Sequence, residues 1–193
     1  MKKMTTVLVT CLIAGAVGAA DIVHQQIGTI AFKTTRLSSN ESNYLKLPVA
    51  WAESYGSFNK SLKLPPQTAE MVRLRVGQMD RCDYCTVFHT RDALAAGMEP
   101  AKVSSIANWR SSGAFSDKER AALAYAEALS SLDQGAISAA YQQLDTVGYS
   151  AVQKEELTNV TILMNVWSRI FLAQGKQSYI EAGANPAGAA KKP

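Results

Sequence analysis

The segment Arg81-Cys82-Asp83-Tyr84-Cys85-Thr86-Val87-Phe88-His89 carries two cysteines and a histidine at helical spacing. At about 100° per residue, Cys82, Cys85 and His89 fall on one stripe of a helix. His89 is one turn from Cys85 but two turns from Cys82, so a histidine base would act on Cys85 first. The spacing therefore predicts that Cys85 is the attacking thiol and that Cys82 is its resolving partner.

Both cysteines stand near the start of a helix that is predicted from about Cys82 to Ala96, with Gly97 as its stop. Exposed backbone N–H groups at a helix N-terminus lower the pKa of a thiol and raise its thiolate fraction. Glu70 lies in or near the first turn of the preceding predicted helix, which starts at Pro65-Pro66. Taken alone, Glu70 is a carboxylate that the positive end of the helix dipole favours.

Residues 1–20 have the pattern of a cleaved secretory signal. Lys2 and Lys3 precede an apolar run from Val7 to Val17, and small residues stand before Asp21. The run is shorter than the roughly 20 residues that a membrane-spanning helix needs, so a retained anchor is the less favoured interpretation. We expect a periplasmic or secreted mature protein without a membrane anchor.

Cleavage would also remove Cys11, so the mature chain would keep only Cys82 and Cys85. A pair three residues apart closes too small a loop to staple a fold, which favours a redox-active or metal-binding role. Loss of Lys2 and Lys3 lowers the formal net charge from +4 to +2. This balance favours neither nucleic acid nor an anionic membrane surface as a partner.

The remainder of the chain is typical of one all-α domain. A length of 193 residues with 47% hydrophobic content suffices for a single domain with a substantial core. We expect an extended N-terminal arm over 21–46, a helical domain over 47–180 and a disordered tail over 181–193. Helical patterns without strand-like alternation predict about six to seven helices, over 47–62, 66–79, 82–96, 100–109, 117–129, 135–148 and 151–174.

Three blocks of the sequence together resemble the AhpD-like alkylhydroperoxidases of the carboxymuconolactone decarboxylase superfamily. The first block is Glu70 with Cys82-x-x-Cys85-x-x-x-His89, followed by Ala93 and Gly97. The others are Phe115 to Glu127, which begins with a Ser116/Glu119 capping box, and Asn165-Val166-Trp167-Ser168-Arg169. The resemblance covers roughly Leu47 to Gln174 and implies an AhpD-like helical domain that assembles as a homo-oligomer.

Carried over by position, the resemblance implies a thiol-dependent peroxidase that reduces hydroperoxides through the Cys82/Cys85 pair. Cys85 resembles the peroxide-reacting cysteine, Cys82 its resolving partner, and Glu70 with His89 the proton relay. This cycle between dithiol and disulfide uses no cofactor and no metal, but it needs an external dithiol. The family's cytoplasmic members use a lipoyl-bearing protein, which an exported protein would not meet, so the reductant here is unknown.

Two positions depart from the family's pattern. Tyr84 stands between the cysteines where the best-known members have a histidine, and a phenol with a reference pKa of about 10 is a poor base near neutral pH. Ser168 replaces the usual asparagine of the last block, which is a milder change.

Three other functions remain open from the sequence. An exported thiol–disulfide oxidoreductase would use the same cysteine pair with little peroxide turnover. A zinc site could draw on Cys82, Cys85, His89 and Glu70, although such sites usually take a second ligand pair from farther along the chain. A binding or scaffold role without turnover is the third.

Overall fold

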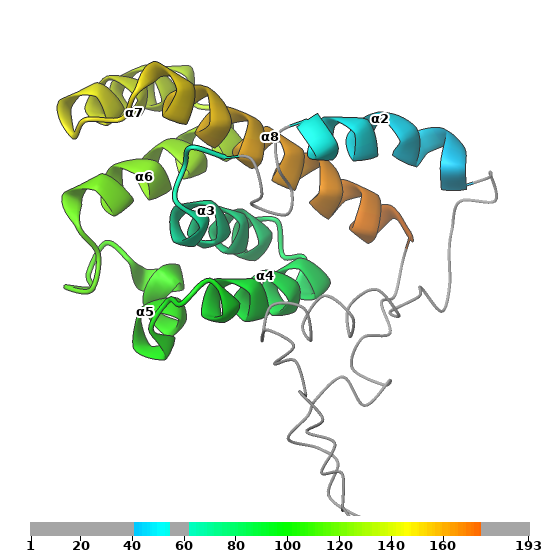
Figure 1. Cartoon of the computed structure of the whole chain (residues 1–193), viewed down its shortest axis with the longest axis horizontal. Helices are drawn as coiled ribbons and strands as arrows, with labels where there is room; N and C mark the ends of the chain where they lie inside the picture. Colours follow the sequence, from blue (N-terminus) through cyan, green and yellow to red (C-terminus); the bar gives the residue numbers. More distant parts are fainter. Residues whose placement is uncertain (1–40, 55–61, 175–193) are drawn as a thin grey trace, which may run out of the picture.

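The computed structural model describes residues 41–54 and 62–174, and within them it contains seven α-helices, one 3₁₀ helix and no strand (Figure 1). The predicted all-α class is confirmed. The helices are α2 (Glu41–Ser54), α3 (Pro66–Met79), α4 (Asp83–Ala95), α5 (Pro100–Ser105), η1 (Ile106–Asn108), α6 (Asp117–Ser131), α7 (Gln134–Thr146) and α8 (Ala151–Gln174). Within these residues, none of the helices has both the length and the apolar content needed to cross a membrane.

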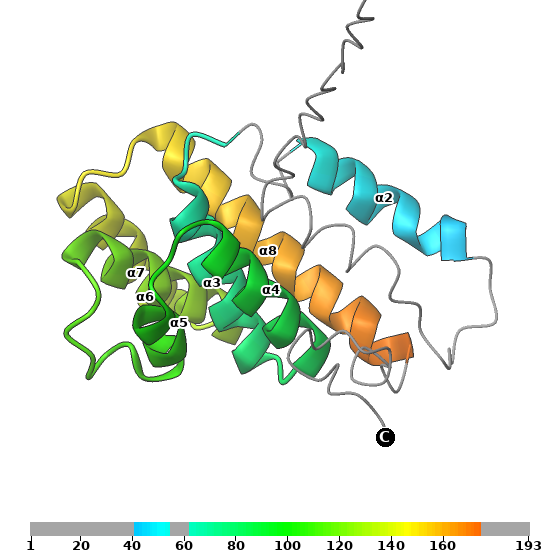
Figure 2. The same ribbon diagram turned by 60° about the horizontal axis from the view of Figure 1, so that its bottom comes forward.

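Helix α3 is the centre of the molecule. It packs against α4, α6 and α8, and Figures 1 and 2 show it between α4 on one side and α8 on the other. Its residues from Thr68 to Gly77 are buried except for the half-buried Arg75. Met71 and Leu74 are completely inaccessible to solvent, and burial of side chains of this size supplies much of the hydrophobic stabilisation. The buried polar side chains of this helix, Thr68, Glu70 and Arg73, are therefore held largely away from water.

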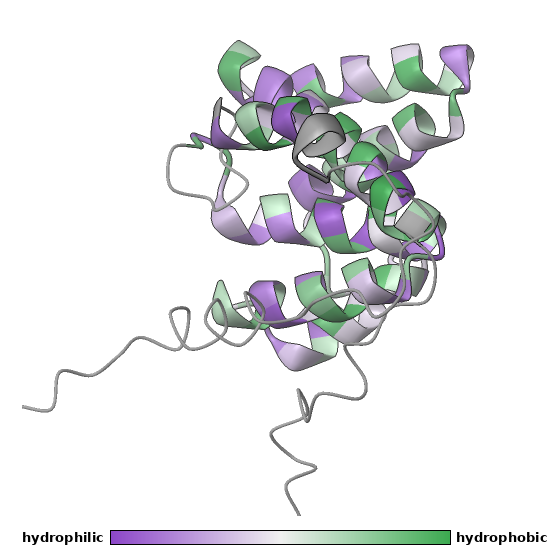
Figure 3. Cartoon of the chain, turned by 90° about the vertical axis from the view of Figure 1, so that its right-hand side faces the viewer, coloured by the Kyte–Doolittle hydropathy of each residue, from purple (hydrophilic) through white to green (hydrophobic). Residues whose placement is uncertain are grey.

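Helix α8 is the longest of the described helices and packs against α2, α3 and α6. Leu157, Val160 and Met164 face the core, whereas the helix ends carry more polar and exposed residues. Figure 3 shows the resulting alternation of hydrophobic and hydrophilic segments along the helices.

Local signals placed most of the helix ends correctly. Pro66 occupies the first turn of α3, and Ser116 and Glu119 form the predicted capping box of α6. Gly97 ends α4 with a φ of 85°, a conformation that glycine adopts without a steric penalty. These features depend on a few neighbouring residues, which is why the sequence alone reveals them.

The start of the first described helix was predicted wrongly. It begins at Glu41 rather than Leu47, so 41–46 are helical instead of belonging to an extended arm, and Pro48 lies inside the helix. Pro48 is typical of a first turn, because a proline inside a helix loses one backbone hydrogen bond and its ring crowds the carbonyl four residues earlier. The predicted leader, the arm from 21 to 40 and the tail from 181 to 193 lie outside the described residues.

Candidate active site

The cysteine pair stands at the N-terminus of α4 and is joined by a disulfide. Cys82 is the N-cap residue, and its sulfur accepts a hydrogen bond from the backbone N–H of Cys85 at 3.3 Å. The Cα atoms are 5.2 Å apart. Cys82 is fully buried and Cys85 is 2% exposed. The structure therefore represents the oxidised state of the predicted redox pair.

Helix α3 approaches the disulfide closely at Gly77. The Gly77 carbonyl accepts the backbone N–H of Cys82 at 3.0 Å, which fixes the entry into α4. A Cβ atom at Gly77 would lie 3.2 Å from the Cβ of Cys85, a crowded contact. The absence of a side chain at Gly77 lets the redox pair sit directly against the central helix.

Glu70 and His89 form a second pair that bridges the same two helices. His89 Nδ1 lies 2.8 Å from Glu70 Oε2, and the Glu70 side chain is only 1% exposed. An ionised carboxylate can only accept, so Nδ1 carries the hydrogen and the Nε2 lone pair remains available as a base. The predicted contact between a buried carboxylate and the histidine is present.

The guanidinium of Arg73 also pairs with Oε1 of Glu70. Arg73 was not singled out from the sequence. The Arg73 side chain is 6% exposed, so both charges are held away from water. A buried carboxylate is costly unless it is paired, and Arg73 supplies a permanent positive charge. Its spacing of three residues from Glu70 was the available sequence signal.

The structure keeps the two pairs separate in the disulfide state. Among the residues that the structure describes, no hydrogen bond joins His89 directly to either sulfur. His89 follows Cys85 by one helical turn on α4, so both project from the side of α4 that meets α3. A substrate oxygen or a water between them is the simplest bridge for proton transfer.

Ser168 is a second residue at this site that the sequence did not identify as functional. It lies on α8 and is fully buried, and its hydroxyl oxygen lies 3.7 Å from the Cys85 sulfur. It also hydrogen-bonds to Asp80, the C-cap residue of α3. Burial raises the pKa of the Asp80 carboxyl, while the Ser168 hydrogen bond and the Arg169 charge act in the opposite direction. The contact links segments far apart in the chain, so spacing alone could not reveal it.

Tyr84 is confined by aromatic neighbours beside the disulfide. Its ring centroid lies 4.5 Å from that of Phe171 on α8 and 6.0 Å from that of Phe88 on α4. Burial raises the pKa of the Tyr84 phenol, and the negative charge of Asp92 raises it further. The phenol therefore stays neutral near pH 7 and does not act as a base beside the disulfide.

A metal centre is poorly supported by the side chains present. Ligand atoms of Glu70, His89 and Asp92 lie within 4.8 Å of one another, a set that differs from the cysteine-containing one considered above. The Arg73 guanidinium, however, already occupies one oxygen of Glu70 and would repel a cation. In this state both sulfurs are committed to the disulfide and do not offer thiolate ligands.

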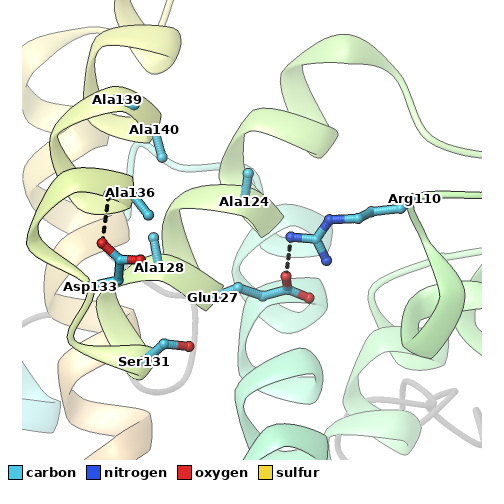
Figure 4. A pocket seen from close by; sticks show the side chains of 9 residues that line it. All are labelled: Arg110, Ala124, Glu127, Ala128, Ser131, Asp133, Ala136, Ala139 and Ala140. Atoms are coloured by element: carbon cyan, nitrogen blue, oxygen red, sulfur yellow. Dashed lines mark hydrogen bonds and ion pairs between the residues drawn. The ribbon is translucent and has the colours of Figure 1, made fainter.

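A hollow of about 470 Å³ lies between α6, α7 and Arg110 (Figure 4). Alanine side chains from both helices make up most of its walls, and the charged side chains of Glu127 and Arg110 are paired with each other. None of Glu70, Cys82, Cys85 and His89 lines it. The hollow is separate from the redox pair and adds no reactive group to it.

Comparison with known proteins finds a matching family model and similar sequences. Residues 49–128 match the model of the carboxymuconolactone decarboxylase family. The chain is 25% identical over 121 residues to the uncharacterized protein YdfG of Bacillus subtilis, covering 63% of this chain and 82% of that protein. It is 31% identical over 121 residues to the uncharacterized protein YnjA of Escherichia coli, covering 63% of each.

Solved structures show the same helical arrangement. An uncharacterized peroxidase-related protein from Ralstonia eutropha, described as an alkylhydroperoxidase AhpD core, superposes with a TM-score of 0.63 at 16% identity over 72% of each chain. A protein of unknown function from Agrobacterium tumefaciens gives a TM-score of 0.63 at 20% identity, covering 72% of this chain and 94% of that one. Residues 49–128 therefore resemble the carboxymuconolactone decarboxylase family, within a domain that has an AhpD-like fold.

Proposed function

We propose that this protein is a thiol-dependent peroxidase of the alkylhydroperoxidase type. The observation that carries the proposal is the disulfide-linked Cys82/Cys85 pair at a helix N-terminus, with the buried Glu70–His89 pair across the same two helices. An isolated Cys-x-x-Cys could serve many functions. A base oriented by a buried carboxylate, one turn from Cys85, is what a peroxide-reacting thiol requires.

The reaction begins at Cys85 in the reduced protein. The thiolate sulfur attacks one oxygen of a hydroperoxide ROOH, the O–O bond breaks, and Cys85 becomes a sulfenic acid. The leaving alkoxide takes a proton and departs as the alcohol ROH. The Cys82 thiol then displaces hydroxide from the Cys85 sulfur, forming the disulfide and, with a proton, water. Two electrons pass from the cysteine pair to the peroxide, and an external dithiol restores the pair.

The neighbouring groups account for thiolate formation. An ordinary cysteine with a pKa of about 8.5 is only a few per cent ionised at neutral pH. The N-terminal amides of α4 favour the anion, and His89 Nε2, oriented by the Nδ1 contact to Glu70, accepts the proton. The imidazolium that results can protonate the leaving alkoxide.

An exported thiol–disulfide oxidoreductase is the second candidate. The disulfide at the start of α4 favours it equally, because the same thiolate could attack a disulfide instead of a peroxide. It would exchange with protein or small dithiols and leave peroxide untouched. The Glu70–His89 pair is the feature that places the peroxidase first.

The cellular setting is part of the proposal. We propose that a secretory signal over 1–20 directs the protein to the periplasm or the exterior, where a dithiol of unidentified nature reduces it. We further propose that it acts as a homo-oligomer. Intact mass of the purified protein and light scattering would test these two points.

Single-turnover peroxide consumption by the reduced protein is the deciding experiment. We expect loss of one equivalent of a hydroperoxide together with a mass decrease of two hydrogens. Cys85→Ser should consume none, whereas Cys82→Ser should consume one equivalent and retain a sulfenic acid that a dimedone-type reagent traps. An unchanged peroxide pool, with rapid exchange against a disulfide, would replace the peroxidase by the oxidoreductase. Sulfenic acid in Cys85→Ser would reverse the assigned roles of the cysteines.

A further inference from the structure

Three segments converge on the Cys85 sulfur from the side of α8. Cys85 comes from the first turn of α4, Asp80 caps the C-terminus of α3, and Ser168 lies on the buried face of α8. The Ser168 hydroxyl contacts both neighbours, at 3.7 Å from the Cys85 sulfur and by a hydrogen bond to the Asp80 carboxyl. Ser168 is therefore the link between the reactive sulfur and a carboxylate that lies apart from Glu70.

The chemistry of the three groups fixes the directions of these hydrogen bonds. A hydroxyl has one hydrogen to donate and lone pairs to accept with. An ionised Asp80 can only accept, so while Cys85 is a thiol the Ser168 hydrogen is directed to Asp80 and its oxygen accepts the S–H. Once Cys85 is a thiolate, the sulfur offers no hydrogen and becomes a second anionic acceptor for the same hydroxyl.

Arg169 makes it possible for Ser168 to change partner. Its NH1 lies 3.5 Å from Asp80 Oδ2 and also donates to Asn165 of α8. Asp80 thus keeps a cationic partner when Ser168 turns towards the sulfur. A charge-assisted hydrogen bond to a buried thiolate is stronger than a neutral one, which favours the turn.

We propose that Ser168 is a catalytic residue that donates its hydroxyl hydrogen to the Cys85 thiolate, and that Asp80 is a positioning residue that holds this hydroxyl beside the thiol. The proposal deepens the peroxidase function and rests on Cys85 being its reacting residue.

The rate of Cys85 alkylation by iodoacetamide, measured against pH on the reduced full-length protein, tests this without peroxide. Fragment ions identify the alkylated cysteine. We expect Ser168→Ala to raise the pH midpoint and to lower the rate at neutral pH about tenfold, as the loss of one charge-assisted hydrogen bond implies. Ser168→Thr, which keeps the hydroxyl, should retain most of the reactivity.

Two further variants separate a chemical role from a structural one. Thr161→Val removes another buried hydroxyl of α8, one that donates to the Leu157 carbonyl at 2.8 Å, and should leave the midpoint unchanged. Asp80→Asn removes a competing negative charge and should shift the midpoint downwards, opposite in sign to Ser168→Ala. The other groups that contribute charge around the redox pair are Glu70, Arg73, His89, Asp92 and Arg169.

Each outcome bears on one proposal at a time. An unshifted midpoint in Ser168→Ala, or equal upward shifts in Ser168→Ala and Thr161→Val, would overturn the role of Ser168. An Asp80→Asn shift of equal size in the wild-type and Ser168→Ala backgrounds would overturn the positioning role of Asp80, because the carboxylate would then act on the sulfur without Ser168. If Ser168→Ala shifts the midpoint as expected but the wild type consumes no peroxide, the hydrogen bond stands and the peroxidase function fails.

Discussion

At the scale of single residues, His89 is predicted to act through its Nε2 atom. His89→Asn keeps an amide hydrogen for Glu70 but lacks the second ring nitrogen, so the buried carboxylate stays paired while the base is lost. We expect single-turnover peroxide consumption at pH 7 to fall about 100-fold, a usual contribution of general base catalysis. Stopped-flow mixing with the reduced protein would measure it, with the exposed Glu99→Gln as control. A decrease in this rate of less than about threefold would contradict the role of His89 as the base.

Glu70 should act only through His89. Glu70→Gln removes the carboxylate that orients the imidazole, and groups that work as a unit have strongly non-additive effects. We therefore expect the double variant Glu70→Gln/His89→Asn to react about as slowly as the slower single variant. The same peroxide assay gives the interaction energy. Rate losses that multiply would show that the two residues act independently.

Tyr84 is predicted to be chemically passive. Burial and then the Asp92 charge raise the pKa of its phenol, so its ionisation does not enter the pH range in which Cys85 reacts. Tyr84→Phe keeps the ring that packs 4.5 Å from Phe171. We expect its profile of Cys85 alkylation between about pH 5 and 9 to match that of the wild type within about threefold. A displaced midpoint would instead assign the hydroxyl a role at the sulfur.

Residue types and spacing revealed only part of this site. Cys82, Cys85 and His89 share one short segment, so their proximity follows from helical geometry, and Glu70 was added through the family resemblance. Ser168 approaches Cys85 across a sequence separation of 83 residues. Such a contact depends on how α8 packs against α3 and α4, which no local pattern encodes. Asp80 and Arg169 escaped notice as site residues for the same reason.

At the scale of helices, the capping box of α6 gives a direct test. The Ser116 side chain accepts the backbone N–H of Glu119 at 3.3 Å, and the Glu119 carboxylate accepts the backbone N–H of Ser116 at 2.8 Å. Ser116→Ala removes one half of this exchange and should lower the free energy of unfolding by about 1 kcal/mol. Urea denaturation measures it, with the exposed Ser138→Ala on α7 as a matched hydroxyl deletion. Equal effects of the two variants would mean that the cap contributes nothing.

A contact between a side chain and the backbone joins α8 to the segment before α3. The Glu156 carboxylate accepts the backbone N–H groups of Lys63 at 2.8 Å and of Leu64 at 2.6 Å. Glu156→Ala would leave the buried Leu64 N–H without this acceptor, so we expect a loss of about 2 kcal/mol in the free energy of unfolding. The exposed Glu155→Ala, one position away, is the control for urea denaturation. A loss of only a few tenths of a kcal/mol, well below about 1 kcal/mol, would show that water replaces the carboxylate as acceptor.

Sequence patterns predicted the helices better than they predicted contacts between distant segments, such as that of Glu156. Caps and stops such as Ser116 and Gly97 are decided within one turn, and they were predicted. Glu156 resembles any surface carboxylate of an amphipathic helix until the distant backbone that it binds is in place. The start of α2 was missed because Pro48 is typical of a first turn, whereas a proline inside a helix costs about 3 kcal/mol.

At the scale of the whole molecule, Glu127 joins three parts of the fold. Its carboxylate accepts from Arg75 of α3 at 2.5 Å and from the indole of Trp109 at 2.8 Å, and it pairs with Arg110 at 2.5 Å. Burial alone would raise the pKa of this carboxyl, but the hydrogen bonds from Trp109, Arg110 and Arg75 outweigh it and leave the pKa below the ordinary value of 4.5. The folded state therefore favours the ionised form.

The lowered pKa of Glu127 predicts a pH-dependent contribution to stability. A carboxyl with a lower pKa in the folded state stabilises the fold above its unfolded pKa of 4.5, and this contribution is lost as the pH falls through the folded value. Glu127→Gln should be less stable than the wild type by about 2 kcal/mol at pH 7, because a neutral amide replaces an acceptor of three charged or buried donors. This difference in the free energy of unfolding should decrease steadily below about pH 4.5. Urea denaturation at several pH values measures it, with the exposed Glu99→Gln as control. A stability difference that stays constant with pH would show that the packing of the Glu127 side chain, and not its charge, joins these helices.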